Sequence, residues 1–398
     1  MTATDRAIDL MAGEFYAGDP YPDFAWMREN APVYHDAVND IYGVATYRDV
    51  KRLGTEPETF SNAEGTRPKF MPLPMMIDTD PPGHTQRRKL VNAGFTPRRI
   101  AALAESARRT CDELIDAVCE QGHCDFVRDL AAPLPLIMIG DMLGVAPEDR
   151  GQLLTWSDDM LRSQGDPDPA GYEGATRAFA EYAEYMQPVF EHRRRTGKDD
   201  DLVGILVHAA VDGEGLDDET LIFETLLILI GGDETTRHVL SGGMLALQEN
   251  PEQYVALRAD LTRLPTAVEE MLRWVSPIKN MVRTTTREVT LGGVDLPEGV
   301  QLLALYPSAN RDATVFAGAD RFDIARDPNP HLAFGFGTHF CLGNQLARLE
   351  LRVMFEQLLT RLPDLRLAEP GPFPLRKANF VSGLERLPVE FTPTPRRS

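Results

Sequence analysis

One cysteine within a glycine-rich run constrains this chain more than any other feature. Cys341 lies in the segment His331-Leu-Ala-Phe-Gly-Phe-Gly-Thr-His-Phe-Cys-Leu-Gly343, where three glycines and several aromatic residues surround a single thiol. Glycine permits positive φ angles and a close approach of the backbone to a flat ligand. Apolar residues then recur at helical spacing from Leu342 to Leu359. Cys341 is therefore predicted to lie at the start of a helix.

This position of Cys341 favours metal ligation. The positive end of a helix dipole favours a thiolate over a thiol, and the free N–H groups there can donate hydrogen bonds to the sulfur. A thiolate held in this way suits an axial bond to haem iron. One alternative is a buried structural cysteine. A zinc site that uses His339 and Cys341 is another, but no second pair of ligands has the needed spacing.

The segment from Phe334 to Gly343 resembles the haem-ligand loop of the cytochrome P450 superfamily, the haem-thiolate monooxygenases. The resemblance covers essentially the whole chain. It implies a mainly α fold with small β-sheets, in which residues 1–398 form a single triangular haem-binding domain. It also implies haem b as the cofactor, with Cys341 as the axial ligand and Phe334, Gly335 and Gly343 close to the haem.

Composition limits the class of partner and the location. The 398 residues carry a net charge of −20, which argues against nucleic acid and anionic membranes as partners. The most apolar run, residues 221–230, includes Glu224 and is well short of the ~20 residues of a membrane-spanning helix. If Cys341 binds a metal, three cysteines remain, which does not indicate a disulfide framework. No signal-peptide pattern opens the sequence, and we expect a cytoplasmic protein.

The apolar spacing predicts a mostly helical chain. Helices are expected over residues 84–120, 147–195 and 266–275, and a long helix from Asp217 to about Glu249. Short strands are expected at 41–47, over 281–305 with turns at 292–293 and 297–299, and over 380–392. Residues 62–82 form a loop rich in proline and methionine.

The long helix contains Gly231-Gly-Asp-Glu-Thr-Thr236 at its centre. Each interior glycine costs about 1 kcal/mol relative to alanine, and threonine can bond the carbonyl of the preceding turn. Together they could open a notch for dioxygen and water, beside which a carboxylate and a hydroxyl could relay protons. A simple kink with a solvated acidic patch is the alternative. The resemblance assigns the proton-delivering acid to Glu234 and the threonine to Thr235, with Asp233 as a polar group near the substrate.

Several basic residues are candidates for binding the haem propionates. His84 and Arg88 are one helical turn apart and share a face. The resemblance implies that they bind propionates together with Arg283 and His339, whereas an isolated pair of this kind is usually just solvated. Glu270 and Arg273, with Arg321 as a third member, are expected to form a structural ionic cluster behind the haem.

A basic patch on this acidic chain indicates how electrons arrive. It comprises Arg87, Arg88, Lys89, Arg98, Arg99, Arg108, Arg109, Arg348 and Arg352. Such a patch would steer an acidic ferredoxin, although ordinary solvated helix faces are the alternative. The sequence has no dinucleotide-binding fingerprint and no reductase extension. We therefore expect a separate ferredoxin and ferredoxin reductase.

The resemblance narrows to the actinobacterial, especially mycobacterial, steroid side-chain monooxygenases. It is carried by residues 73–78, 87–95, 226–238 and 378–385. It implies hydroxylation and further oxidation of the terminal methyl (C26/C27) of cholesterol or cholest-4-en-3-one. Besides Asp233, the residues expected at the substrate are Met75, Met76, Leu226, Leu229, Ile230, Met281, Val282, Phe380 and Val381. Methionines adapt to bulky ligands, but core packing is the commoner role for such residues.

Two other functions remain open from the sequence. A fatty-acid or branched-lipid hydroxylase of the same fold would need a similar apolar channel. A haem-binding sensor without turnover would need no proton relay, so the adjacent Glu234 and Thr235 argue against it.

Overall fold

The computed structural model describes residues 6–162, 169–197, 201–211 and 214–397. Over these ranges the chain is mainly helical with small sheets, which confirms the predicted fold class. The helices are α1 (Gly13–Ala17), α2 (Tyr21–Asn30), α3 (Tyr47–Thr55), α4 (Gly83–Val91), α5 (Pro97–Ala102), α6 (Ala104–Val118), α7 (Pro133–Met142), α8 (Arg150–Arg162), α9 (Pro169–Thr196), α10 (Leu202–Val207), α11 (Asp218–Glu249), α12 (Pro251–Ala259), α13 (Leu264–Val275), α14 (Tyr306–Ala309) and α15 (Asn344–Arg361). The strands are β1 (Val33–Asp36), β2 (Ile41–Val44), β3 (Phe60–Ser61), β4 (His123–Asp125), β5 (Ala210–Val211), β6 (Glu214–Gly215), β7 (Val282–Thr285), β8 (Val289–Leu291), β9 (Val294–Leu296), β10 (Gln301–Ala304), β11 (Arg366–Leu367) and β12 (Pro388–Glu390).

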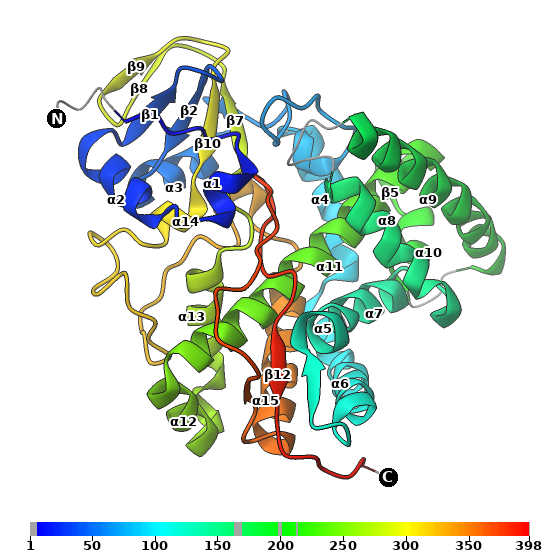
Figure 1. Ribbon diagram of the computed structural model, residues 1–398. Helices are drawn as coiled ribbons and strands as arrows, with labels where there is room; N and C mark the ends of the chain where they lie inside the picture. The colour runs from blue at the N-terminus through cyan, green and yellow to red at the C-terminus, as the bar shows by residue number, and fades with distance from the viewer. Residues whose placement is uncertain (1–5, 163–168, 198–200, 212–213, 398) are drawn as a thin grey trace.

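The main sheet and the helices occupy different parts of the molecule. Figure 1 shows strands β1, β2, β7 and β10 gathered with α1 to α3 at one end, and the remaining large helices beside and below them. The outline is wide at the sheet and narrows toward α12 and the C-terminus, so that it is roughly triangular.

Strands from distant parts of the chain build the main sheet. Its order is β1-β2-β10-β7-β3, and β2 pairs with β10 in parallel, with Tyr42 opposite Leu302. The β8–β9 hairpin turns at Gly292 and Gly293, which have φ values of +54° and +81° and thus need glycine. These strands match the prediction for residues 281–305. Because side chains alternate along β7, only every second one faces the helical part of the molecule.

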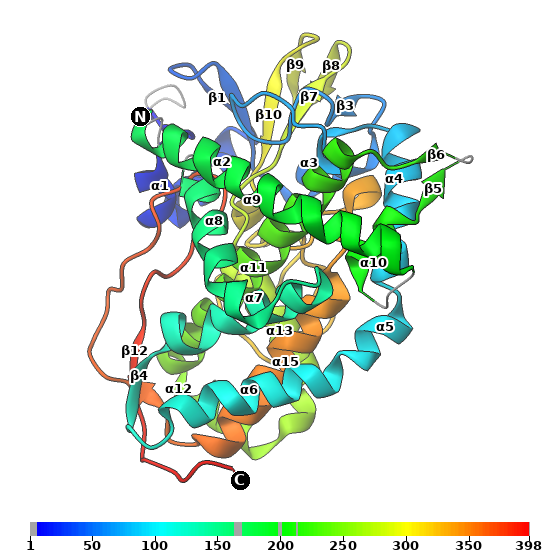
Figure 2. The same cartoon turned by 90° about the vertical axis from the view of Figure 1, so that its right-hand side faces the viewer.

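The predicted long helix is confirmed. The Asp217 carboxylate accepts a hydrogen bond from the backbone N–H of Thr220 at 2.8 Å and caps α11, which then runs without interruption to Glu249. The helix packs against α7, α13 and α15, and two perpendicular views show it crossing the middle of the molecule (Figures 1 and 2). A helix that is apolar on all sides is expected in such a buried position.

Other elements differ from the prediction. Residues 84–120 form three helices, α4, α5 and α6, because a turn at Asn92–Gly94 separates the first two and Pro97 opens the second. Within 147–195, α8 and α9 are separate, and residues 163–168 between them are not described. The strand at 41–47 ends at Val44. Residues 380–392 hold one strand, β12, and take part in isolated bridges from Val381 to Ile278 and from Leu384 to Leu375.

The ionic cluster behind α13 has a different third member from the one predicted. Glu270 and Arg273 are fully buried and bonded at 2.7 and 2.8 Å. The third residue is Arg326, whose Nε lies 3.0 Å from the Glu270 carboxylate. Arg321 is exposed and contributes its backbone carbonyl, which accepts from both arginines. The choice of Arg321 was wrong because a loop fold, and not helical spacing, decides which arginine turns inward.

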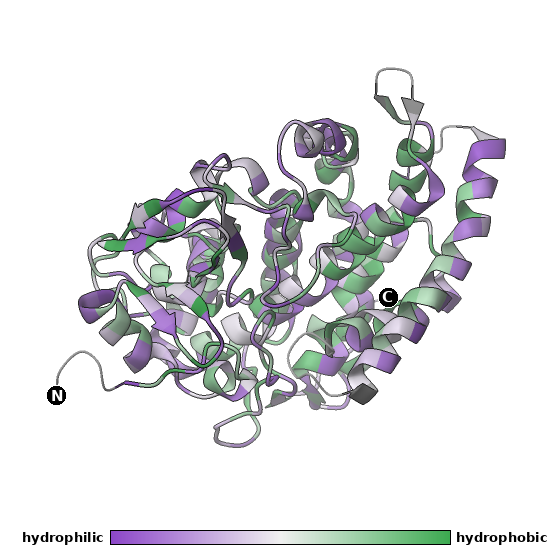
Figure 3. Ribbon diagram, turned by 90° about the horizontal axis from the view of Figure 1, so that it is seen from above, coloured by the Kyte–Doolittle hydropathy of each residue, from purple (hydrophilic) through white to green (hydrophobic). Residues whose placement is uncertain are grey.

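Hydropathy follows this arrangement. Seen from above, hydrophobic residues lie along the inner helices and hydrophilic residues mark the outward turns of the peripheral ones (Figure 3). Within the described ranges, no helix has both the length and the apolar character that a membrane crossing requires.

Candidate active site

The loop before α15 is tightly folded around Cys341. The N–H of Cys341 donates to the carbonyl of Phe334 at 2.9 Å and closes the loop. Gly335 and Gly337 have φ values of +68° and +75°. A β-carbon on Gly337 would lie 1.8 Å from the carbonyl oxygen of Gly54 in α3, so no other residue fits there.

The sulfur of Cys341 is positioned just ahead of α15, as predicted. The backbone N–H groups of Gly343 and Asn344 donate to it, which lowers the pKa of the thiol, but burial outweighs them and raises the pKa above its usual value. The start of the helix thus favours the thiolate, as expected from the sequence, but does not by itself offset the burial of the sulfur. A metal makes Cys341 a thiolate outright, since a coordinating thiol is deprotonated.

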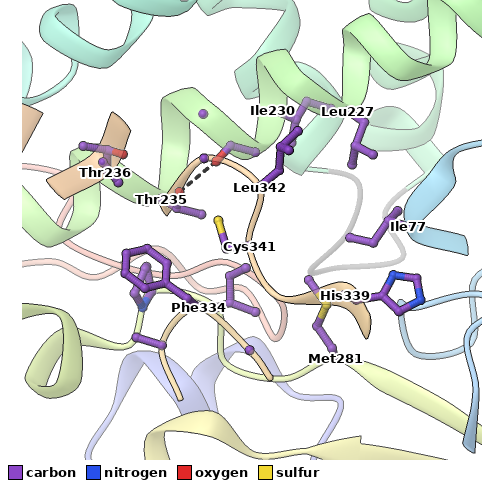
Figure 4. Close-up of a pocket in the computed structure, with 18 of the residues that line it drawn as sticks. Ile77, Leu227, Ile230, Thr235, Thr236, Met281, Phe334, His339, Cys341 and Leu342 are labelled. Carbon is purple, nitrogen blue, oxygen red and sulfur yellow. Dashed lines mark hydrogen bonds between the residues drawn. The ribbon is translucent and has the colours of Figure 1, made fainter. Parts of the chain in front are cut away.

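Cys341 faces a cavity between α11, α15 and the main sheet. The side chains around it are mostly apolar, including Ile77, Leu227, Ile230 and Met281 (Figure 4). The other three cysteines, Cys111, Cys119 and Cys124, are buried in the core and are not part of the cavity lining. The one thiol that a ligand in this cavity can reach, among the residues described, is that of Cys341.

The four predicted propionate-binding residues all line this cavity. The rings of His84 and His339 lie 4.0 Å apart between centroids, and Arg88 donates to the carbonyl of Phe340 at 2.6 Å. Arg283 is buried, and its Nη1 donates to the carbonyl of its neighbour Val282. Alternation along β7 turns Arg283 toward the cavity and Val282 away from it.

These donors fit a flat cofactor with two carboxylates. Both ring nitrogens of His84 and Nε2 of His339 are buried without a partner in the part of the chain that the structure describes. Burial lowers the pKa of His84, and burial together with nearby Arg283, His84 and Arg88 lowers that of His339 to about 2. Unpaired buried donors are costly, and haem propionates would satisfy them. The residues present therefore fit haem, with Phe334, Gly335 and Gly343 also lining its space.

The adjacent Thr235 and Glu234 face different surroundings. Thr235 lines the cavity, and its Oγ1 donates to the carbonyl of Gly231 at 2.8 Å, which is the back-bond to the preceding turn expected from the sequence (Figure 4). Glu234 is fully buried and is not among the lining residues. Its carboxylate accepts from Arg376 at 2.8 Å and from Arg237. The His238 ring, 3.4 Å away, and the charges of Arg237 and Arg376 hold its pKa well below the usual value despite burial.

The adjacent glycines Gly231 and Gly232 of α11 both line the cavity but differ in what surrounds them. Gly231 lines the cavity, and a β-carbon there would meet no atom within 4 Å. A β-carbon on Gly232 would lie 2.5 Å from Ile139 of α7, so this glycine permits close packing of two helices. The helix continues without a break through both glycines, so the backbone does not open into the expected notch. The cavity wall simply lacks a side chain at Gly231.

Half of the predicted substrate contacts do not line the cavity. Those that do are Met76, Ile230, Met281, Phe380 and Val381. Those that do not are Met75, Leu226, Leu229, Asp233 and Val282, all of them buried in the core. Leu226, Leu229 and Asp233 share the face of α11 that points away from the cavity. Asp233 is buried against acidic neighbours, and burial with nearby Glu234 raises its pKa.

Several lining residues were not predicted. Ile77, Leu227 and Ile278 extend the apolar wall, while Arg67, Thr236 and Glu350 add polar groups. Leu227 could have been found by its spacing of three and eight residues from Ile230 and Thr235. Arg67 lies in the irregular loop that follows β3, where no periodicity indicates direction.

The basic patch is smaller than predicted. Arg348 is bonded to Glu269 through two nitrogens at 2.6 and 2.8 Å, and Arg87 lies 3.5 Å from Glu224. The exposed cations that remain are Lys89, Arg98, Arg109 and Arg352. Because α5 packs on α15, two of the contributing segments do meet on the side of the Cys341 loop.

The chain matches the family model for cytochrome P450 over residues 47–363. It is 52% identical to a steroid C26-monooxygenase of Mycolicibacterium smegmatis, over 97% of this chain and 96% of the relative, and 53% identical to one of Mycobacterium tuberculosis, over 98% of both. Among solved structures, cytochrome P450 CYP109Q5 from Chondromyces apiculatus has a TM-score of 0.87 at 36% identity and covers 97% of this chain and 98% of its own. CYP109E1 from Bacillus megaterium in complex with testosterone has a TM-score of 0.85 at 32% identity and covers 94% of this chain and 99% of its own.

Proposed function

Because the chain belongs to the cytochrome P450 family, we propose that it hydroxylates, and then further oxidises, the terminal methyl group of a steroid side chain. The substrate is cholesterol or cholest-4-en-3-one. The observation that carries the proposal is the apolar cavity that reaches Cys341, in a chain more than half identical to relatives described as steroid C26-monooxygenases.

Haem bound through a cysteine thiolate is the cofactor of this family. In this chain Cys341 would ligate the iron, and His84, Arg88, Arg283 and His339 would hold the propionates. When bound, the haem supplies activation of dioxygen and transfer of one oxygen atom into a C–H bond.

The α11 segment supplies the protons. Thr235 holds a hydroxyl on the cavity wall, with its own proton donated to Gly231. Glu234 lies behind it in a buried cluster with Arg237, Arg376 and Asp158. We propose that protons enter through this cluster and reach the cavity at the Thr235 hydroxyl.

The apolar wall determines which carbon reacts. Ile77, Leu227, Ile230 and Met281 exclude water from the space over Cys341 (Figure 4). A methyl group is the end of a steroid side chain that such a wall accepts, and holding it in one place supplies much of the selectivity for an unactivated C–H bond.

Electrons come from separate proteins. We propose an acidic ferredoxin, reduced by a ferredoxin reductase, that docks on the exposed cations Lys89, Arg98, Arg109 and Arg352. We also propose that residues 1–398 form one domain, in which β2 and β10 share a sheet. All four cysteines are free thiols, which suits a reducing compartment such as the cytoplasm.

Spectral titration tests the proposal. The purified ferric haem protein is titrated with cholest-4-en-3-one and, in parallel, with palmitate and a branched fatty acid. We expect saturable displacement of the iron-bound water at micromolar steroid and weaker responses to both acids. Saturation by a fatty acid with no response to the steroid would replace the steroid by a lipid substrate. A thiolate-type reduced-CO spectrum retained in Cys341→Ser would contradict the assignment of the ligand.

A further inference from the structure

A buried cation without a partner lines the apolar cavity. Arg67 is 7% exposed, and its Nε and Nη1 have no hydrogen-bond partner within the described ranges. No carboxylate of the described chain lies within ion-pairing distance of it. An unpaired buried charge is expensive, so a guanidinium kept at this position indicates a ligand group that it meets.

The side chain is held in place from several directions. Its guanidinium lies over the rings of Phe70 and Phe380, 5.5 and 5.8 Å from the centroids. The preceding residue, Thr66, donates to Asp78 through its N–H and its hydroxyl, at 3.0 and 2.6 Å. The carbonyl of Thr66 accepts from Val282 at 2.9 Å. Arg67 is thus preorganised. Two aromatic rings pack against its guanidinium, and its Nε and Nη1 have no hydrogen-bond partner among the described residues.

Arg67 comes from a different segment of the chain than the propionate-binding residues, namely the loop that follows β3. Among those four, the rings of His84 and His339 lie 4.0 Å apart between centroids. Burial lowers the pKa of Arg67 and Asp78 partly offsets this, and Asp78 acts on Arg283 in the same way. The ring contact of Arg67, Phe380, also lines the cavity.

From this placement we infer that Arg67 binds the oxygen at C3 of the steroid and makes the enzyme select 3-oxygenated steroids. The inference rests on the proposed function, which supplies the ligand class. A sterol or stenone of this class carries one oxygen, at the end remote from the terminal methyl, and the rest of its surface is apolar. A charged donor that is not assigned to the propionates and lies among apolar lining residues matches that distribution. A hydrogen bond from a charged group is also stronger than one between neutral groups.

The test compares ligands that differ at C3. Ferric wild-type protein and the variants Arg67→Met and Arg67→Lys are titrated with cholest-4-en-3-one and with 5α-cholestane, which lacks the oxygen, both delivered in cyclodextrin. We expect wild type to prefer the stenone by about 10- to 100-fold. Arg67→Met should bring the two affinities close together, mainly by weakening stenone binding, and Arg67→Lys should retain part of the preference.

Arg311→Met is the matched control. Arg311 is also 7% exposed, lies over the rings of Trp274 and Tyr21 and has an unpartnered Nε, but it does not line the cavity. This change should leave the ratio of the two affinities as in wild type. If Arg67→Met does not fold, the ratio in wild type and in Arg67→Lys still decides the question.

Other outcomes would overturn the inference in distinguishable ways. Equal affinity of wild type for stenone and cholestane would contradict the role of Arg67 but would still agree with a steroid as the substrate. Faster haem transfer to apomyoglobin in Arg67→Met, with both ligands weakened equally, would assign Arg67 to a haem propionate. A wild-type protein that binds neither ligand would overturn the proposed function and this inference with it.

Discussion

Glu234 and Thr235 are consecutive residues of α11, yet their side chains are in different environments. The Thr235 hydroxyl lies on the cavity wall and is bonded to Gly231 at 2.8 Å, whereas the Glu234 carboxylate is buried and bonded to Arg376 at 2.8 Å. A proton that passes between them crosses from a charged cluster to an apolar cavity. The pair therefore lies at the boundary between a charged cluster and the apolar cavity, which is where we propose that protons are delivered.

Thr235→Ala should uncouple electron consumption from product formation. Removal of the hydroxyl removes the proton-handling group on the cavity wall, so product per electron consumed should fall by about tenfold or more. Steroid binding should persist. The control is Thr225→Ala on the same helix, where Oγ1 also bonds the preceding turn, at 2.7 Å to Leu221, but is fully buried away from the cavity. Unchanged coupling in Thr235→Ala would remove the proposed role.

Glu234→Gln should slow turnover and destabilise the protein. The change leaves Arg237 and Arg376 buried with one carboxylate fewer, and breaking a buried ion pair costs about 3–5 kcal/mol. Turnover with saturating steroid should show an enlarged solvent isotope effect if proton delivery becomes limiting. A variant that is destabilised but keeps the wild-type rate and isotope effect would restrict Glu234 to a structural role.

Glu224 should make stability depend on pH. Its carboxylate joins α11 to the loop over the cavity by accepting from the N–H of Met76 at 2.8 Å, and burial raises its pKa from 4.5 to about 7. Because the pKa is higher in the folded protein, its contribution is full below pH 4.5 and is lost as the pH rises through 7. The loss amounts to about 3 kcal/mol.

The pH effect is measured by urea unfolding of wild type and Glu224→Gln at several values from pH 5 to 8. The variant should show a flatter profile than wild type. Glu219→Gln, an exposed acid at the start of the same helix, is the control and should follow wild type. Parallel profiles for wild type and Glu224→Gln would contradict the assignment.

The two arginines near Glu270 should differ sharply in their importance. Arg326→Met removes a buried partner of Glu270 and is expected to cost about 3–5 kcal/mol of unfolding free energy and to reduce haem incorporation. Arg321→Met changes an exposed side chain and keeps the carbonyl that the cluster uses, so it should cost less than about 0.5 kcal/mol. Equal losses in the two variants would contradict the observed cluster.

Charge reversal on the basic patch should slow reduction by an acidic ferredoxin. For Lys89→Glu combined with Arg352→Glu, we expect a fall of about tenfold or more at low ionic strength, and a smaller difference at high salt. Reduction of the haem by dithionite should not change. Lys377→Glu, an exposed lysine outside the patch, serves as the control. A salt-independent rate in the wild type would argue against electrostatic docking.

The sequence predicts most of the elements and only part of the site. The Cys341 loop and α11 could be predicted because their signals are local: the glycines of the loop, the capping residue Asp217 and the long apolar run of the helix. Leu226 and Leu229 were misplaced because α11 is apolar on every side, so hydropathy does not distinguish the face toward the cavity. Val282 was misplaced for a similar reason in a strand buried on both faces.

Long-range contacts explain the remaining differences. Arg326 replaces Arg321 in the ionic cluster, and Arg67 lines the cavity. Both residues are in loops whose path depends on contacts with distant parts of the chain, which local sequence patterns do not predict. The burial that raises the pKa of the Cys341 thiol likewise depends on the whole fold, whereas the helix start that opposes it is local.

The position of oxygen insertion tests the central claim most directly. The haem protein is supplied with cholest-4-en-3-one, a ferredoxin, its reductase and reduced nicotinamide cofactor, and the products are identified by mass spectrometry and NMR. The account predicts a hydroxyl group on a terminal methyl of the side chain, followed by its further oxidation. Oxygen inserted on the ring system, or no steroid product from a protein with a thiolate-type reduced-CO spectrum, would contradict it.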